Sequence, residues 1–538
     1  MPLLQWLTRD ADLKLSSKAP YRLLEYVPEL SFGATDAENM LIQGDNLDAL
    51  KTLLPFYAGR VKCIYIDPPF NTEQAFPDYD DNLEHAQWLA MMYPRLELLR
   101  EFLTEDGTLF IHIDDNELGY LIAIADEVMG RKNRVAVVTF KQGAATGHKA
   151  INPGMVSNTN FLLAYAKEKL KWKPRRIFTG RERDKRYSQF LTNPNEDYRK
   201  WRMVTLSSAF CKKQGKKLTE LKKSLGPKVV EELLNEFVIA HASQVIRTAR
   251  PDYDAVSEAA QKLIDRSVAE PAQLFLLKRD DYPDMYFKGG ERLIFYREKL
   301  KEIDGVLVAG EPLTTLWDDL LSNNLHKEGG VEFPKSKKPE ALIKRLLEMC
   351  TSPGDFVLDS FLGSGTTAAV AHKMGRRWIG IESGMHAETH CVPRLTKVVA
   401  GEQEGISKAV DWRGGGGIRF YRLGPPVFDA NGRINSGIRY AHLAAHVWFT
   451  ETHTPLTAPP DSPLLGIHNG VAYYLLFNGI LGDKRPEGGN VLTSKVLAAL
   501  PPFDGPKVIY GESSRFGSER LQMERITFKQ TPYDIKSR

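Results

Sequence analysis

Apolar runs and amphipathic stretches alternate along most of this chain. Runs of apolar, β-branched and aromatic residues without a breaker predict three buried strands, at residues 61–66, 107–113 and 135–140. Apolar side chains at helical spacing predict two helices between them, at residues 85–102 and 117–129. Strands that alternate with helices in this way pair into a mostly parallel sheet covered by helices. The pattern of residues 41–140 therefore predicts an α/β fold.

The same signals divide the rest of the chain. Further strands are predicted at residues 160–165, 356–359 and 378–382. Residues 229–277 are expected to be largely helical, residues 282–296 to form a hairpin, and residues 470–477 and 507–510 to be strands of another α/β unit. These patterns predict five parts: an N-terminal arm (1–40), two halves of one sheet (41–140 and 316–400), an insertion (141–315) and a C-terminal domain (401–538).

The composition limits the class of protein. A chain of 538 residues exceeds one ordinary core, and its 42% hydrophobic and 26% charged content is typical of a soluble globular protein. No apolar run is long enough to span a bilayer, and the first residues lack the pattern of a secretory signal. The four cysteines lie far apart without a CxxC pair, which argues against a disulfide framework or a zinc site. We therefore expect a cytoplasmic protein without a structural metal.

Positive charge is concentrated in residues 167–223. This segment holds 19 lysines and arginines against 6 acidic residues, or +13, whereas the whole chain carries only +4. Aromatic residues are interleaved with these charges, as on surfaces that neutralise phosphates and stack on bases. An ordinary solvated surface with surplus lysines is the alternative. The candidate contacts to a polyanion are six residues near the start of the segment: Lys173, Arg175, Arg176, Arg181, Arg183 and Arg186.

One stretch joins a buried strand to a rigid turn, at Ile64-Tyr65-Ile66-Asp67-Pro68-Pro69-Phe70-Asn71-Thr72. Prolines cannot continue a central strand, so the chain must leave the sheet at Asp67. A carboxylate, a rigid turn and the aromatic ring of Phe70 then stand at a strand end, which is where α/β sheets bind ligands. The alternative is a stiff loop without chemistry, since Asp and Pro are common turn residues.

A second stretch has the order of a nucleotide-cofactor unit, which is strand, Gly-x-Gly turn, helix, strand and acid. The strand that ends at Asp359 leads into Phe361-Leu362-Gly363-Ser364-Gly365-Thr366-Thr367, and Glu382 ends the next strand. Because Thr366 and not a lysine follows Gly365, a P-loop for ATP or GTP is excluded. NAD and S-adenosylmethionine (AdoMet) both fit the unit, since a helix N-terminus attracts an anion and an acid can accept both ribose hydroxyls. The turn at Asp67 favours AdoMet, because a dehydrogenase has no evident use for it.

Two other polar groups have simpler interpretations. Asp45 or Asn46 follows a short strand and is expected to cap the next helix. His112, followed by acids at 114–117, could suggest a metal site. No second ligand cluster follows, so a hydrogen-bonded histidine and a helix N-cap are the preferred interpretation.

The two constellations together resemble the DNA amino-methyltransferases, and most closely the adenine-N6 modification subunits of type III restriction–modification systems. Lys338-Pro339 is similar to the element that lines the methionine part of AdoMet in that family. Residues 412–420 (Trp-Arg-Gly-Gly-Gly-Gly-Ile-Arg-Phe) and 526–530 (Ile-Thr-Phe-Lys-Gln) resemble the C-terminal region of those subunits. The turn at Asp67–Phe70 (the catalytic turn) precedes the loop at Phe361–Thr367 (the cofactor loop), which is the permuted, or beta, order of the family. Position 70 is Phe where many relatives have Tyr, so stacking is retained and a hydroxyl hydrogen bond is absent.

The resemblance implies a Rossmann-like AdoMet-dependent methyltransferase fold with a permuted, mixed and mostly parallel sheet. It makes the insertion a DNA-recognition domain. The implied catalytic residues are Asp67, Pro68, Pro69 and Phe70. The implied cofactor-binding residues are Asp45, Lys338, Pro339, Asp359, Phe361, Gly363, Gly365, Thr366 and Glu382.

The implied function is site-specific transfer of a methyl group from AdoMet to adenine N6 in duplex DNA. The target base would be flipped out and stack on Phe70 and Phe76. Cytosine-N4 transfer is the nearest alternative, because the same turn can hold either exocyclic amine. Outside the enzyme class, the chain could be a DNA-recognition subunit that positions a partner helicase or nuclease. The implied partners are double-stranded DNA, a second copy of the chain and a restriction subunit.

Overall fold

The computed structural model describes residues 3–71, 84–142, 155–303, 305–320, 325–331, 337–428, 434–435, 437–456 and 461–531. Phe76 and the glycine-rich segment 143–149 lie outside the described residues. The chain forms two compact units, and each is described by itself. Unit 1 comprises Met1–Arg175 and Thr314–Arg538, and unit 2 comprises Arg176–Leu313. No helix among the described residues is long and apolar enough to cross a membrane.

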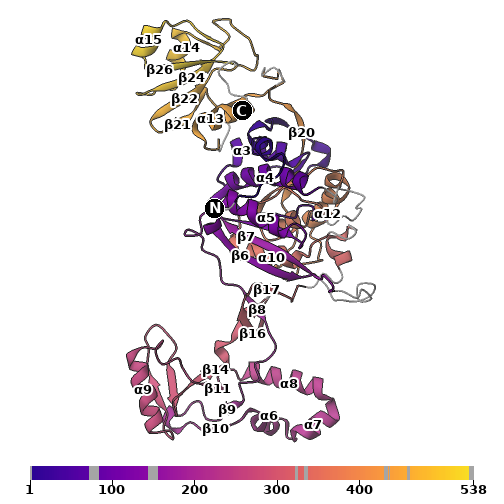
Figure 1. Ribbon diagram of the computed structural model, residues 1–538, viewed down its shortest axis with the longest axis vertical. Helices are drawn as coiled ribbons and strands as arrows, with labels where there is room; N and C mark the ends of the chain where they lie inside the picture. The colour runs from indigo at the N-terminus through magenta and orange to yellow at the C-terminus, as the bar shows by residue number, and fades with distance from the viewer. Residues whose placement is uncertain are drawn as a thin grey trace. The chain divides into compact units, whose positions relative to one another are not determined.

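Unit 1 is built on a mixed sheet that has eleven strands within the described ranges (Figure 1). The strands follow one another across the sheet in the order β1 (Arg22–Tyr26), β20 (Gly417–Pro426), β3 (Met40–Gln43), β19 (Arg377–Glu382), β18 (Phe356–Asp359), β4 (Val61–Ile66), β5 (Leu103–Ile113), β7 (Thr159–Ala166), β6 (Arg134–Lys141) and β17 (Leu316–Trp317), with β2 (Phe32–Gly33) paired to β20. From β20 to β5 all neighbours are parallel. The predicted mixed, mostly parallel sheet is confirmed.

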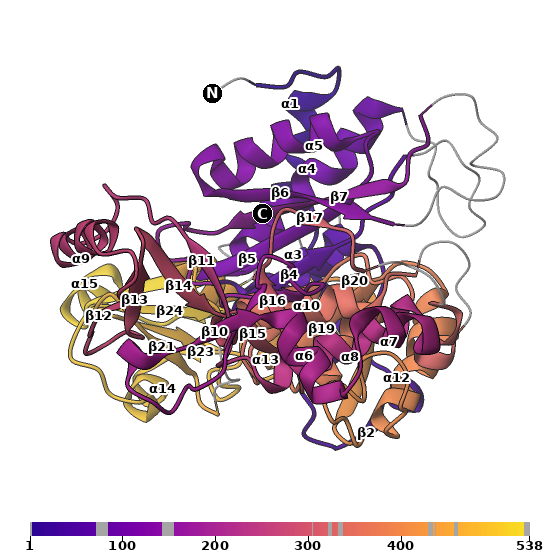
Figure 2. The same ribbon diagram turned by 90° about the horizontal axis from the view of Figure 1, so that it is seen from below.

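Helices cover both faces of this sheet. The first half of the chain contributes α1 (Arg9–Asp12), α2 (Leu15–Lys18), η1 (Pro28–Leu30), α3 (Asn46–Tyr57), α4 (His85–Phe102), α5 (Leu118–Ala125), η2 (Asp126–Gly130) and η3 (Arg131–Asn133). The second half contributes η7 (Leu325–Gly330), α10 (Glu340–Cys350), α11 (Thr366–Lys373), η8 (Ala387–Cys391) and α12 (Val392–Val399). Figure 2 shows α4 and α5 on one side of the sheet and α10 and α12 on the other.

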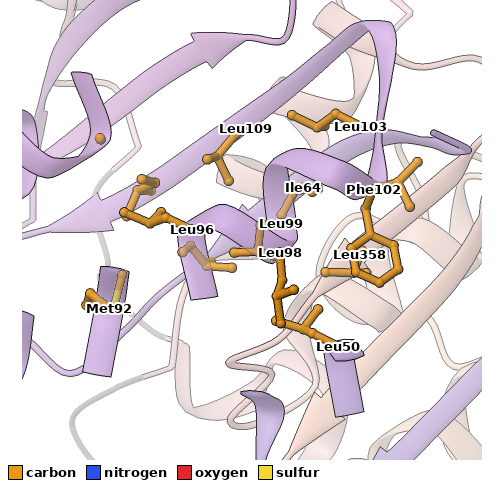
Figure 3. Packing of buried hydrophobic residues seen from close by; sticks show 14 of the residues in the cluster. Leu50, Ile64, Met92, Leu96, Leu98, Leu99, Phe102, Leu103, Leu109 and Leu358 are labelled. Carbon is orange, nitrogen blue, oxygen red and sulfur yellow. The ribbon is translucent and has the colours of Figure 1, made fainter. Parts of the chain in front are cut away.

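The main core lies between the sheet and the first group of helices. Alternate strand residues point to opposite faces, so Ile64 and Ile66 of β4 and Leu358 of β18 reach the same core. Leu50 of α3 and Leu99 of α4 are fully buried against them, as Figure 3 shows. Burial of this kind stabilises a fold by about 25 cal/mol per Å² of apolar surface removed from water. The packing fixes the register of β4 and β18, and therefore where these two strands end.

Residues beyond the main sheet form a second, smaller α/β assembly within unit 1. Its sheet has the order β21 (Leu464–His468), β22 (Val471–Leu475), β24 (Lys507–Gly511) and β26 (Ile526–Gln530), and its other elements are α13 (Tyr440–Thr452), β23 (Val491–Leu492), α14 (Ser494–Ala499), β25 (Ser513–Ser514) and α15 (Ser518–Met523). The predicted strands at 470–477 and 507–510 are confirmed as β22 and β24. Residues 417–426, predicted to lie in the C-terminal domain, instead form β20, because this strand pairs with β3 in the main sheet.

Unit 2 contains a six-stranded and a three-stranded sheet among its described residues. The first has the order β10 (Met203–Thr205), β9 (Gln189–Leu191), β11 (Val245–Ala249), β14 (Glu291–Phe295), β13 (Met285–Lys288) and β12 (Phe275–Leu277), and the second has β15 (Leu300–Ile303), β16 (Val306–Pro312) and β8 (Phe178–Gly180). The helices are η5 (Tyr198–Lys200), α6 (Leu206–Gln214), α7 (Leu218–Leu225), α8 (Pro227–Ala240), α9 (Glu258–Ala269) and η6 (Tyr296–Glu298). The predicted hairpin at 282–296 is formed by β13 and β14.

Two sequence expectations about this region differ from the structure. Residues 229–277 are not largely helical, because the β-branched run at Val245 and Ile246 pairs with β9 and β14 as β11 and separates α8 from α9. The compact unit begins at Arg176 and not near residue 141. Residues 159–166 form β7, which pairs with both β5 and β6 and therefore belongs to the main sheet.

Candidate active site

The two constellations found in the sequence meet at one edge of the main sheet. β18 lies between β4 and β19, and all three strands are parallel. Their carboxyl ends therefore point the same way, which places Asp67 after β4 beside Asp359 at the end of β18 and Glu382 at the end of β19. Parallel sheets bind ligands at this edge. Segments far apart in the chain thus contribute to one site.

Two hydrogen bonds hold the Asp67–Phe70 turn and the residue that follows it, one donated by α4 and one accepted by the residue before α5. Trp88 of α4 donates its Nε1–H to the carbonyl oxygen of Pro69 at 2.8 Å. Asn71 has a left-handed backbone (φ 61°) and donates its side-chain amide to Glu117, just before α5, at 2.6 Å. A non-glycine residue in this conformation needs support from its surroundings. The proline rings fix only the φ angles of Pro68 and Pro69. The two hydrogen bonds restrain the rest of the turn.

Phe70, the last residue of the turn, packs beside a buried histidine. Its half-buried ring is 5.7 Å from the ring of His112 between centroids. His112 is buried, with Nδ1 3.0 Å from the Tyr65 hydroxyl and Nε2 3.2 Å from the Asn160 amide. Burial, and to a smaller extent the Lys338 ammonium, hold the pKa of His112 well below its usual value. The interpretation of His112 as a hydrogen-bonded histidine is therefore confirmed.

The cofactor loop is a glycine turn that leads into α11. Gly363 (φ 54°) and Gly365 (φ 81°) both have left-handed backbones, which side chains other than glycine rarely adopt. Gly365 caps the N-terminus of α11, and the amide of Gly363 donates to Glu382 Oε2 at 2.7 Å. A side chain at Gly363 would meet no atom within 4 Å, so open space lies beside the turn. The loop thus lies between a helix N-terminus and a carboxylate, with open space beside Gly363.

Asp359 and Glu382 sit in surroundings that oppose their ionisation. Burial raises the pKa of Asp359 to about 7, although its carboxylate accepts a hydrogen bond from the Phe361 amide at 2.9 Å. Burial also raises the pKa of Glu382, whose two oxygens accept the amides of Gly363 and Gly384. A positively charged ligand would favour the ionised form of both groups. Perturbed carboxyls of this kind at a strand end are typical of a functional site.

A family model described as DNA methylase matches residues 61–391, more than half of the chain. The chain belongs to the DNA methylase family. The matched range begins with β4 and ends with η8, so it includes the catalytic turn, the cofactor loop and the whole of unit 2. The predicted resemblance is confirmed at the level of the family.

Two curated relatives of this chain carry the names of modification subunits. A Haemophilus influenzae protein named "Probable type III restriction-modification enzyme HindVI Mod subunit" is 35% identical over 430 residues, 73% of this chain and 54% of the relative. The Escherichia coli "Type III restriction-modification enzyme EcoP15I Mod subunit" is 25% identical over 389 residues, 64% of this chain and 57% of the relative. The methylase thus spans about half the length of the curated relatives that it matches.

A solved structure gives a weaker match. PvuII DNA methyltransferase (cytosine-N4-specific) aligns with a TM-score of 0.32 and 14% identity, over 70% of this chain and 91% of that chain. A score of this size is too low to support a conclusion about the methylase.

Several residues of the site were not found by sequence reasoning. Glu117 stands at the N-cap position of α5, yet its fully buried side chain makes no capping bond and instead holds Asn71 and His85. Asn46 is buried between the two halves of the methylase. It donates to the carbonyl oxygen of Ser360 at 2.7 Å and accepts from Arg95 at 2.5 Å. For both Glu117 and Asn46 the only sequence signal was a polar residue before a predicted helix, which predicts capping.

A buried ion cluster contacts the first residue of the helix at the cofactor loop. Glu340, the first residue of α10, pairs with Arg394 at 2.7 Å and with Lys373 at 2.8 Å, and all three side chains are excluded from solvent. Arg394 also donates to the Thr366 hydroxyl at 2.7 Å. Pro339 lies at the N-cap of α10, where its ψ of 135° is extended.

Asp45 acts as the sequence predicts. Its carboxylate caps α3 by accepting the amides of Leu47 and Asp48, at 2.9 and 3.2 Å. The same carboxylate forms an ion pair with Arg95 at 3.0 Å. Its role toward a cofactor stays a prediction.

The six candidate polyanion contacts divide between the units of the methylase. Lys173 and Arg175 belong to unit 1, where Arg175 donates to Ser352 at 2.6 Å. In unit 2, Arg176 lies over the Phe178 ring and Arg181 is 3.8 Å from Glu311. Two of the arginines form short ion pairs there, Arg183 with Glu231 at 2.8 Å and Arg186 with Asp184 at 2.7 Å. Their binding to DNA stays a prediction.

Proposed function

We propose that the methylase transfers a methyl group from AdoMet to the N6 amine of adenine in duplex DNA, as the modification subunit of a type III-like system. The observation that carries the proposal is the meeting of Asp67–Phe70 and Gly363–Glu382 at the ends of three adjoining parallel strands. An amine held at one turn and a methyl donor held at the other would be neighbours. Membership of the DNA methylase family and the names of the relatives support it.

The catalytic turn suits an exocyclic amine. Adenine N6 is a poor nucleophile, because its lone pair is delocalised into the ring. Hydrogen bonds from the two amine hydrogens to the Asp67 carboxylate and the Pro68 carbonyl would favour a more tetrahedral nitrogen. Placing both reactants in line supplies up to roughly 7–11 kcal/mol in favourable cases. The bonds that hold Pro69 and Asn71 keep these acceptors in a fixed geometry before the base arrives.

Phe70 provides a stacking surface for a base taken out of the duplex. An amine inside a duplex cannot reach the turn, so the base must be flipped at a cost of about a few kcal/mol. Stacking of the base on an aromatic ring contributes about 1–3 kcal/mol and offsets part of this cost. The half-buried Phe70 ring stands three residues after Asp67, which suits a base whose amine reaches that carboxylate.

The residues at the cofactor loop fit AdoMet. Open space adjoins Gly363, the N-terminus of α11 suits the methionine carboxylate, and Glu382 can accept the ribose hydroxyls. Asp359 and Phe361 would line the same space, and Asp359 would respond to a positive charge there. AdoMet, when bound, supplies an electrophilic methyl group. The protein's part is to orient the loop, exclude water and hold the acceptor amine.

Partners are part of the same proposal. Unit 2 would read the DNA sequence, and a restriction subunit and a second copy of the chain would complete the enzyme in the cytoplasm. Cytosine-N4 transfer remains the nearest alternative, since both amines are exocyclic and planar. A recognition-only subunit would bind AdoMet without transferring its methyl group.

The test is transfer of a labelled methyl group from AdoMet to mixed-sequence duplex DNA by the purified chain. We expect incorporation by the wild type and none by Asp67→Ala, with the dissociation constant of AdoMet changed by less than about twofold. Glu382→Ala is the complementary variant, and it should weaken AdoMet binding by about 10- to 100-fold. Full activity of Asp67→Ala, or a wild type that binds AdoMet and transfers nothing to any DNA, would contradict the proposal.

A further inference from the structure

Lys338 makes a contact that the sequence motifs did not indicate. Its ammonium lies 2.5 Å from Asp67 Oδ2 and 4.9 Å from the centre of the Phe70 ring. The resemblance assigned Lys338 to the cofactor and Asp67 to the target amine. In the structure, this lysine contacts two residues of the catalytic turn.

The contact is sheltered from solvent. Only 12% of the Lys338 side chain and 18% of the Asp67 side chain are exposed. Charge-assisted hydrogen bonds are about twice as strong as neutral ones, and water and salt screen a partly buried pair less than a surface pair. Asp67 follows β4 and precedes a proline, and a charged partner restricts its side-chain torsions. Lys338 is such a partner.

Lys338 is itself anchored to the cofactor loop. Pro339 and Glu340 follow it directly, and Glu340 is held in the buried cluster by Arg394 and Lys373. Arg394 donates to Thr366 at the start of α11. Side-chain contacts therefore link the start of α11 to Arg394 and Glu340, the backbone links Glu340 to Lys338, and Lys338 contacts the Asp67 carboxylate. The two turns are tied together by side chains as well as by the sheet.

We propose that Lys338 is a positioning residue for methyl transfer, which fixes the Asp67 carboxylate in the orientation that accepts the target amine and couples it to the cofactor loop. The inference rests on the proposed function. A carboxylate has two oxygens with several acceptor sites, so the lysine can hold Oδ2 while the amine binds the same group.

This role differs in its kinetics from a direct contact to AdoMet. A positioning residue stabilises the transition state, so its removal lowers the rate of methyl transfer at saturating AdoMet and DNA. Removal of a residue that only binds the cofactor raises the dissociation constant of AdoMet. It leaves the rate at saturating AdoMet and DNA unchanged. The two roles are separated by measuring both quantities on one variant.

The experiment uses the full-length chain with Lys338→Met, which removes the charge at similar length, and Lys338→Arg, which retains it. Single-turnover methyl transfer is measured at saturating AdoMet and DNA, and AdoMet binding is measured by calorimetry. For Lys338→Met we expect the transfer rate to fall by about 10- to 100-fold while the AdoMet dissociation constant stays within about twofold. Lys338→Arg, which keeps the charge beside Asp67, should be at least about fivefold faster than Lys338→Met.

Lys344→Met is the matched control. It removes a lysine of α10 that pairs with Glu348 on the same helix, at 2.8 Å. We expect its transfer rate to stay within about twofold of the wild type. Thermal melting of all variants shows whether they are folded, and Lys338→Arg keeps the proposal testable if Lys338→Met is not.

Three results would overturn the proposal. These are an unchanged saturated rate for Lys338→Met with weaker AdoMet binding, an unchanged rate with unchanged binding, and a folded Lys338→Arg that is as slow as Lys338→Met. Failure of the proposed function is a separate outcome, because it shows as a wild type that transfers no methyl group.

Discussion

Three carboxylates stand at one edge of the main sheet, and each has a different environment. Asp67 has an ammonium beside it, Asp359 is fully buried, and Glu382 holds two backbone amides. Residue type alone would give the three groups the same chemistry. Their surroundings place a cation beside Asp67 and raise the pKa of Asp359 and Glu382, which makes the charge of those two groups sensitive to a bound ligand.

Asp359 should make the stability of the methylase depend on pH. Its pKa is raised to about 7, whereas an unfolded aspartate titrates near its ordinary value of about 3.9. Between these two values the native state binds more protons, so Asp359 lowers stability as the pH rises through this window. Asp359→Asn removes that penalty. We expect the melting temperature of Asp359→Asn, relative to the wild type, to be higher at pH 8 than at pH 4.5.

Differential scanning calorimetry without cofactor at the two pH values measures this difference. A comparison of the same two proteins at each pH cancels the contribution of the other titrating groups. A difference in melting temperature that is independent of pH, or smaller at pH 8, would contradict the burial of an ionisable Asp359.

At the scale of elements, α10 links the stability of the fold to the geometry of the cofactor loop. Its first residue, Glu340, neutralises two buried cations, and one of these, Arg394, contacts the first residue of α11. Buried ion pairs contribute little compared with apolar residues, but removal of one partner leaves an uncompensated charge. The cluster is therefore a site at which a single substitution should be costly.

Glu340→Gln should lower the free energy of unfolding by about 3–5 kcal/mol, because Arg394 loses its carboxylate partner and Lys373 loses one of two. Denaturant unfolding measures the change. Glu348→Gln, which removes an ion pair on the same helix, is the control and should cost less than about 1 kcal/mol. Equal effects of the two substitutions would show that the cluster adds nothing beyond a surface pair.

In unit 2, α6 and the residues between α6 and α7 carry four exposed lysines of the basic segment. Lys212, Lys213, Lys216 and Lys217 are exposed, and no ion pair to them is found in the part of the chain that the structure describes. Arg183 and Arg186 already pair with acids, so part of their charge is neutralised. Ammonium groups without an acidic partner release more counterions from DNA than paired guanidinium groups. The lysines are thus the stronger candidates for binding phosphates.

Replacement of these four lysines by glutamine should weaken DNA binding and reduce its salt dependence. The slope of the logarithm of affinity against that of salt concentration should fall by about 0.9 for each phosphate that the variant no longer neutralises. Fluorescence anisotropy at several salt concentrations gives the slope, with Arg186→Gln as the control of small effect. An unchanged slope in the lysine variant would assign these four lysines to an ordinary solvated face.

At the scale of the whole molecule, sequence patterns predicted the main sheet and the two turns, because buried strands and breakers leave local signals. Asp67 and Glu382 could be placed at strand ends for this reason. The pairing of Lys338 with Asp67 could not be predicted, since it joins residues 271 positions apart and neither has a periodic signal. The same holds for the contact of Asn46 with Ser360. The strand at Val245 was missed because its apolar run is also compatible with a helix.

The proposed methylation of adenine by this chain is tested by identifying the nucleosides of treated DNA. The purified chain is incubated with AdoMet and mixed-sequence duplex DNA, and the DNA is digested to nucleosides for mass spectrometry. We predict N6-methyladenine in the wild-type reaction and none with Asp67→Ala. N4-methylcytosine as the product would contradict the assignment of the base, and the absence of any methylated nucleoside while AdoMet is bound would contradict the assignment of the activity.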